Sequence, residues 1–122
     1  MTEKKKLKVA VIGSRSLTDY DVVEEAMEPY RNRAGMIVSG GARGTDRLAE
    51  EWAKENEVET LIFLPDPAHG RGGYRIRNEK IVESADMVVA FWDGESRGTK
   101  MVIEMCKDLG VPVEIVKISS DT

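Results

Sequence analysis

The chain has 122 residues, of which 41% are hydrophobic and 33% are charged, and its formal net charge at pH 7 is −4. A chain of this length can bury a hydrophobic core without disulfides or metal ions, so we expect residues 1–122 to form a single domain. The acidic balance argues against nucleic acid as a partner, because broad electrostatic binding to nucleic acid needs a basic face.

Cysteine usage and hydropathy narrow the class of protein further. The single cysteine, Cys106, has no disulfide partner and indicates core packing in a reducing compartment. Without a cluster of cysteines and histidines we expect no metal site, and no cofactor is required. Neither a membrane-spanning apolar run nor a secretory signal is recognisable, so we expect a cytoplasmic protein without membrane contact.

Strand and helix patterns alternate from one end of the chain to the other. Apolar runs predict strands at 8–12, 36–38, 61–64, 87–92 and 113–116. Apolar residues at helical spacing predict helices at 22–30, 48–53, 74–84 and 102–109, the first preceded by a capping box from Thr18 to Asp21. Two prolines and three glycines make residues 65–73 the longest expected loop.

This alternation predicts the topology. Parallel strands need crossover helices, so we expect an α/β Rossmann-like domain of three layers around a five-stranded parallel sheet in the order 3-2-1-4-5. In that order the chain reverses between the first and the fourth strand. Open α/β sheets bind ligands at such a point, beyond the carboxyl ends of the strands.

Three predicted strands end in glycine-rich loops that each carry an arginine. The tripeptide Arg-Gly-Thr occurs at 43–45 and again at 97–99, and the strand 8–12 is followed by Gly-Ser-Arg. Glycines let a backbone approach a ligand and helix N-termini attract anions, although ordinary strand-to-helix turns also favour Gly and Thr. The loops supply these candidate phosphate-binding and ligand-binding residues: Gly13, Ser14, Arg15, Gly40, Gly41, Arg43, Gly44, Thr45, Asp46, Asp93, Gly94, Gly98 and Thr99.

Arg77 and Asn78 join the candidate ligand site because the helix 74–84 starts beside the same edge of the sheet. A guanidinium grips phosphate, and an amide reads a base edge or a ribose hydroxyl. The alternative for Arg77 is an ion pair with Glu79 or Asp86.

The acidic candidates have competing explanations. A carboxylate at a helix start, such as Asp46, is also favoured by the helix dipole, whereas Asp93 ends a strand at the switch point and suits hydroxyl recognition. Glu104 is only a weak catalytic candidate, because its place on the helix, five residues beyond Thr99, turns it away from the site. No catalytic residue is identified; if the chain is an enzyme, the candidates are Arg77, Asp93 and Glu104.

The ordered set of motifs resembles the SLOG superfamily, and in particular its YspA-like branch. The matching segments are Gly13-Ser14-Arg15, the run 40–49 (GGARGTDRLA), Ile76-Arg77-Asn78, and the loop that leads to Gly98-Thr99. The resemblance implies a Rossmann-like domain that binds a nucleotide or a nucleotide derivative. The superfamily also contains the LOG phosphoribohydrolases and the DNA-processing protein DprA.

One departure from the LOG enzymes bears on activity. Their motif Pro-Gly-Gly-x-Gly-Thr-x-x-Glu ends in a catalytic glutamate, whereas the third residue after Thr99 here is Val102. Our first interpretation is therefore the binding or sensing of a small nucleotide-derived ligand. An N-glycosidic hydrolase acting on a nucleoside monophosphate and a DprA-like DNA-binding module are the alternatives, and a homodimer of the LOG kind stays open.

Overall fold

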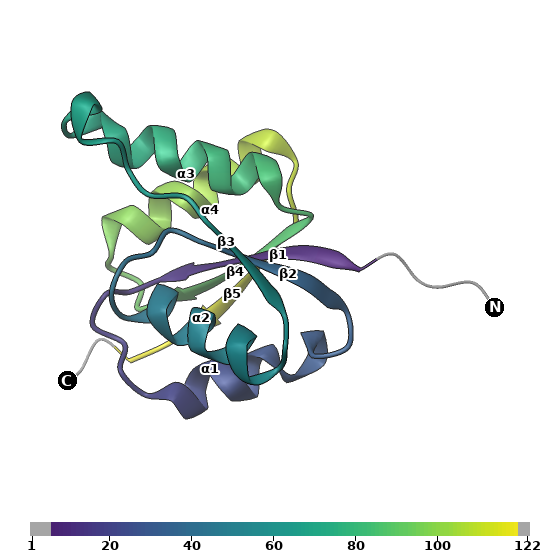
Figure 1. The fold of residues 1–122 in the computed structure, drawn as a ribbon. Helices are drawn as coiled ribbons and strands as arrows, with labels where there is room; N and C mark the ends of the chain where they lie inside the picture. The colour runs from purple at the N-terminus through teal and green to yellow at the C-terminus, as the bar shows by residue number, and fades with distance from the viewer. Residues whose placement is uncertain (1–5, 120–122) are drawn as a thin grey trace.

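The computed structural model describes residues 6–119, in which strands and helices alternate as expected (Figure 1). The elements are β1 (Leu7–Gly13), α1 (Tyr20–Met27), the 3-10 helix η1 (Glu28–Tyr30), β2 (Ala34–Ser39), α2 (Thr45–Glu55), β3 (Glu59–Ile62), the 3-10 helix η2 (Pro67–His69), α3 (Gly72–Ser84), β4 (Met87–Trp92), α4 (Arg97–Leu109) and β5 (Val113–Lys117).

The strands form one parallel sheet in the order β3-β2-β1-β4-β5, which confirms the predicted topology. β1 lies in the centre, paired with β2 on one side and with β4 on the other. Helices α3 and α4 cover one face of the sheet and α1 and α2 the other (Figure 1). The carboxyl ends of β1, β2 and β4 therefore open on one edge.

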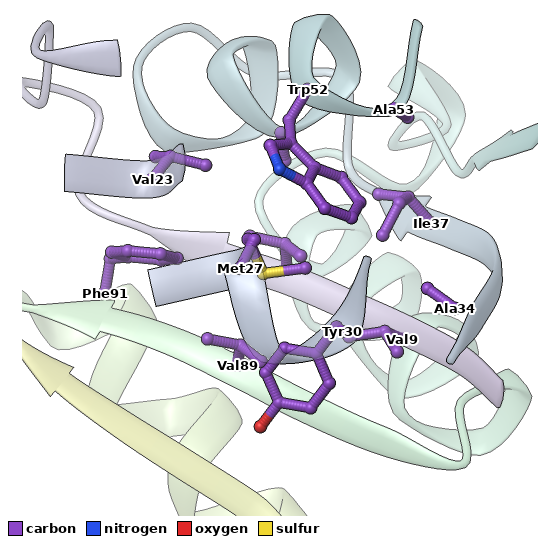
Figure 2. Close-up of a cluster of buried hydrophobic side chains, with 12 residues drawn as sticks. Val9, Val23, Met27, Tyr30, Ala34, Ile37, Trp52, Ala53, Val89 and Phe91 are labelled. Carbon is purple, nitrogen blue, oxygen red and sulfur yellow. The ribbon is translucent and has the colours of Figure 1, made fainter. Parts of the chain in front are cut away.

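Alternate residues of β1 point into two separate cores. Val9 and Val11 face α1 and α2, where the fully buried side chains of Met27 and Trp52 pack against them (Figure 2). A stripe of apolar residues on each helix makes this packing possible, and its burial is the main stabilising contribution of this layer.

Ala10 and Ile12 face the opposite way, toward α3 and α4. Val82 and Cys106 are fully buried in this second core, as expected for the lone cysteine. Packing on both faces explains why β1 and β4 are almost continuously apolar.

Two local expectations were wrong. α1 is capped by Asp19, whose side chain accepts a hydrogen bond from the Asp21 N–H at 3.0 Å, and not by Thr18. The segment 65–73 contains η2, which Asp66 caps by accepting from the Ala68 N–H at 2.9 Å, and α3 already begins at Gly72. In both places an aspartate accepts a hydrogen bond from the N–H two residues ahead.

Within residues 6–119, no helix is long and apolar enough to cross a membrane. The same part of the chain holds no group of three histidine, cysteine or acidic residues arranged to hold a metal ion.

Candidate functional site

The loop after β1 is fastened to the start of α2. Thr45 donates its backbone N–H and its hydroxyl to the Ser14 carbonyl at 3.1 and 2.8 Å, and the Ser14 N–H reaches the Phe91 carbonyl at 3.1 Å. Gly44 precedes Thr45 with a φ of 75°, and a Cβ there would collide with the backbone of Arg15. The glycine thus lets two of the predicted loops touch, and it leaves the Arg15 side chain exposed at the edge.

Arg77 ties three elements together beneath this edge. Its guanidinium donates to the Gly40 carbonyl at 2.5 Å, to the Phe63 carbonyl at 3.3 Å and to the Asn78 amide oxygen at 2.8 Å. Only 8% of the residue is exposed, and burial lowers the pKa of Arg77. Arg75, by contrast, is the arginine that pairs with Glu79, at 3.4 Å.

Asp46 lies in the first turn of α2, where a Cβ on Gly40 would meet both the Asp46 Oδ2 atom, at 2.9 Å, and the Arg77 guanidinium. One of its carboxylate oxygens accepts from the Ala42 N–H at 3.2 Å, which closes the loop over the helix start. Burial raises the pKa of Asp46 to about 6, even though that hydrogen bond and the charge of Arg77 both act in the opposite direction. The site therefore holds a carboxyl group whose pKa lies above the ordinary range for aspartate.

Two arginines lie close to the ring of Tyr74. The guanidinium carbons of Arg15 and Arg77 lie 5.5 and 5.7 Å from the centre of its ring, within the range of cation–π contact. The residue is 46% exposed, so Tyr74 is accessible to a ligand at this edge.

Two adjoining hollows open around this group. We call the first the α3–α4 slot: it measures about 690 Å³ and has an apolar floor of Ile12, Ile81, Met101 and Val102. The second, the β3 hollow, measures about 500 Å³ and is lined by Gly40, Gly41, Leu64 and Pro65. Both share the walls formed by Arg15, Ala42, Arg43, Tyr74 and Arg77.

The loop between β4 and α4 is held by its own side chains. Asp93 accepts from the N–H groups of Glu95 and Ser96, both at 2.8 Å, and these hydrogen bonds lower the pKa of Asp93. The Trp92 indole N–H donates to the Ser96 carbonyl at 3.0 Å. These bonds aim the start of α4 at the slot, so Asp93 and Trp92 shape the loop from outside the hollows.

Most of the predicted site residues meet at this one place. The slot is lined by Gly13, Ser14, Arg15, Arg43, Asp46, Arg77, Asn78, Gly98 and Thr99, and the β3 hollow adds Gly40 and Gly41. Of the described residues, Gly44 and Thr45 lie behind the walls, while Asp93, Gly94 and Glu104 line neither hollow. Asp46 is the one carboxylate among residues 6–119 that lines either hollow.

Sequence reasoning missed Tyr74, Leu64 and Pro65. Tyr74 was available as an aromatic residue close to Arg71, Arg75 and Arg77, which is a pattern found where nucleic acids bind. Leu64 and Pro65 carried no such signal, because the fold alone brings the end of β3 beside the loop after β2.

The geometry agrees with the comparisons to known proteins. A family model described as "YspA, cpYpsA-related SLOG family" matches residues 7–69, from β1 to η2. The chain belongs to this family. A curated relative, the Gene 61 protein of Mycobacterium phage D29, is 33% identical in an alignment 116 residues long, and the match covers 87% of this chain and 93% of the relative.

The SLOG fold also appears in two solved structures of DNA processing protein A (DprA). The Streptococcus pneumoniae protein superposes with a TM-score of 0.79 at 21% identity over 95% of this chain, which spans 52% of that protein. The Helicobacter pylori protein, whose structure is described for its single-stranded DNA binding mode, gives 0.72 at 23% identity over 96% of this chain and 68% of its own length. At these identities the likeness establishes the fold.

The expectation that nucleic acid is an unlikely partner was wrong. A protein with the same fold is described for the way it binds single-stranded DNA, and the net charge of −4 averages over surfaces that differ. Acidic side chains crowd the helices on the face of the sheet opposite α3, among them Asp21, Glu24, Glu25, Glu51 and Glu55. The charge of a whole chain therefore does not describe a local group of arginines.

Proposed function

We propose that this SLOG domain binds single-stranded DNA across the two hollows. The observation that carries the proposal is the partly exposed Tyr74, whose ring has the guanidinium groups of Arg15 and Arg77 within cation–π distance. Single-stranded nucleic acid is bound by this combination, in which cationic groups hold the backbone and an aromatic ring stacks on a base.

The three arginines contribute to phosphate binding in different ways. Arg15 and Arg43 are exposed and share the walls of both hollows, so their guanidinium forks are free to meet phosphodiester oxygens. Arg77 is fixed by its carbonyl partners and adds positive charge from below. This arrangement gives contacts that do not depend on base sequence.

The shape of the site favours a single strand over a duplex. The apolar floor of the α3–α4 slot is out of reach for bases that stay paired and stacked, whereas the bases of a single strand are free to turn toward it. The DprA structure of H. pylori, described for single-stranded DNA binding, supports this choice through the shared fold.

The test measures binding of a fluorescein-labelled oligo(dT) by anisotropy over a range of salt concentrations. Arg15→Ala should weaken binding by about 10- to 100-fold, the range for losing a hydrogen bond to a charged group. The slope of log K against log salt should become shallower by about 0.7 for each phosphate that the variant no longer neutralises.

The matched control is Arg47→Ala, because Arg47 is an exposed arginine on α2 that lines neither hollow. Equal losses of affinity for the two variants, or tighter binding to a duplex than to the strand, would contradict the proposal.

A second candidate is a free nucleotide-derived ligand. The volume of the α3–α4 slot lies within the roughly 300–1,000 Å³ typical of small-molecule pockets, and its apolar floor beside a polar rim suits a base with its phosphate. A mononucleotide that competes with oligo(dT) at equal affinity supports this candidate. Release of free base from that mononucleotide would add the hydrolase activity.

A further inference from the structure

We infer that the β3 hollow is a second base-binding subsite, so that the domain holds two successive nucleotides with their shared phosphate at Arg15 and Arg43. One base enters the α3–α4 slot and the other lies against Leu64. This inference rests on the proposed function and extends it from a class of ligand to a minimum length of strand.

The division of the cleft carries the argument. Each hollow has a volume within the range for one small ligand, and the two hollows have five lining residues in common. Those shared walls hold Arg15, Arg43 and Arg77, so positive charge is concentrated between the hollows. A dinucleotide matches this arrangement, because its anionic phosphate lies between two flat, largely uncharged bases.

The chemistry of the β3 hollow suits a base. Leu64 is 70% exposed, the most exposed of the large apolar side chains in the described part of the chain. It packs against the backbone of Gly41, where a Cβ would approach the Leu64 Cδ2 atom to 2.7 Å and the Ile62 Cγ2 atom to 3.0 Å. Glycine at this position therefore lets the Leu64 side chain lie against the loop backbone, on the side of the hollow where a base would pack.

The position of this apolar surface favours nucleic acid over a protein partner. Leu64 lines the same hollow as Arg15, Arg43 and Arg77, and Tyr74 bounds both hollows. An apolar surface continuous with guanidinium groups complements a base attached to its phosphate. Self-association through Ile62 and Leu64 is the competing occupant, and the test separates it.

The experiment compares three ligands of equal charge by isothermal titration calorimetry. They are the dinucleotide pTpT and its two analogues in which either the first or the second base is replaced by an abasic residue. Wild-type protein should bind pTpT about 5- to 100-fold more tightly than either analogue, because each stacked base contributes separately.

Leu64→Ala should lower the affinity for pTpT to that for one of the two analogues, while leaving the affinity for that analogue within about twofold of wild type. The matched control is Leu109→Ala, because Leu109 is 51% exposed at the end of α4 and lines neither hollow. This control should bind all three ligands as the wild type does.

The outcomes separate the two proposals. If oligo(dT) binds but pTpT binds no more tightly than one of the two analogues, the second subsite is refuted and strand binding stands. The same conclusion follows if Leu64→Ala weakens the binding of all three ligands equally. If no strand of any length binds, both are refuted. A wild-type dimer in light scattering that Leu64→Ala converts to a monomer would assign the surface to self-association and overturn the subsite.

Discussion

The buried carboxyl group of Asp46 allows a direct test of how much a buried charge lowers the stability of this fold. Burial raises the pKa of its carboxyl group to about 6 from an ordinary value of 3.8. Between these two values the native state binds the proton and the unfolded chain does not, so the stability of the fold decreases as the pH rises through this window. Above the window, the charged carboxylate opposes folding.

Asp46→Asn removes that charge and keeps an oxygen able to accept from the Ala42 N–H. At about 1.36 kcal/mol per pKa unit the full effect is roughly 3 kcal/mol, and we expect the variant to be about 1–3 kcal/mol more stable than wild type at pH 8. Near pH 4.5 most of the wild-type carboxyl is protonated, so most of the difference should vanish.

The assay is urea unfolding at pH 4.5 and pH 8, followed by tryptophan fluorescence, since Trp52 is fully buried. The quantity that matters is the change in the stability difference between the two pH values, because titrating groups common to both proteins cancel. A difference that does not depend on pH, or a wild type more stable than the variant at pH 8, would refute the reasoning.

Three further predictions concern the loops and side chains of the site. Gly44→Ala should lower the free energy of unfolding in urea by at least about 2 kcal/mol, because the new Cβ meets the Arg15 backbone. Gly94 also has a positive φ but has open space around it, so Gly94→Ala should lower this free energy by only about 1 kcal/mol. Equal losses would disprove the close approach. Arg77→Ala should lower the free energy of unfolding by at least about 2 kcal/mol by leaving carbonyls without a donor, unlike Arg15→Ala; an unchanged melting temperature would show that the bonds are dispensable. Hydrogen exchange in residues 65–73 should slow when oligo(dT) binds, because the segment leads from the β3 hollow into α3; exchange unchanged there but slowed elsewhere in the cleft would show that the segment does not touch the strand.

The sequence determined the fold almost completely. Apolar runs and helical stripes are local patterns, and strict alternation of the two leaves a parallel sheet with right-handed crossovers as the arrangement that buries both. The order β3-β2-β1-β4-β5 and the gathering of the glycine loops at one edge follow from those rules. The weaker predictions concerned helix ends, where Asp19 and Thr18 compete for the same cap.

The sequence also identified most of the residues that line the two hollows, because loops after neighbouring parallel strands must meet. It did not identify the role of each one. Asp93 has the position of a ligand-binding residue, but its carboxylate accepts from two backbone N–H groups of its own loop. Short aspartate side chains make such local bonds readily, and a sequence pattern does not distinguish the two uses.

Tertiary structure alone decided three properties of the site. The raised pKa of Asp46 depends on burial beneath the loop after β2, and the fixed position of Arg77 depends on carbonyls from two other segments. The pairing of Tyr74 with Arg15 joins residues from α3 and from the loop after β1. Electrostatics and stacking depend on distances through space, whereas strands and helices follow from neighbours along the chain, so the sequence determined the fold and the tertiary structure determined the chemistry of the site.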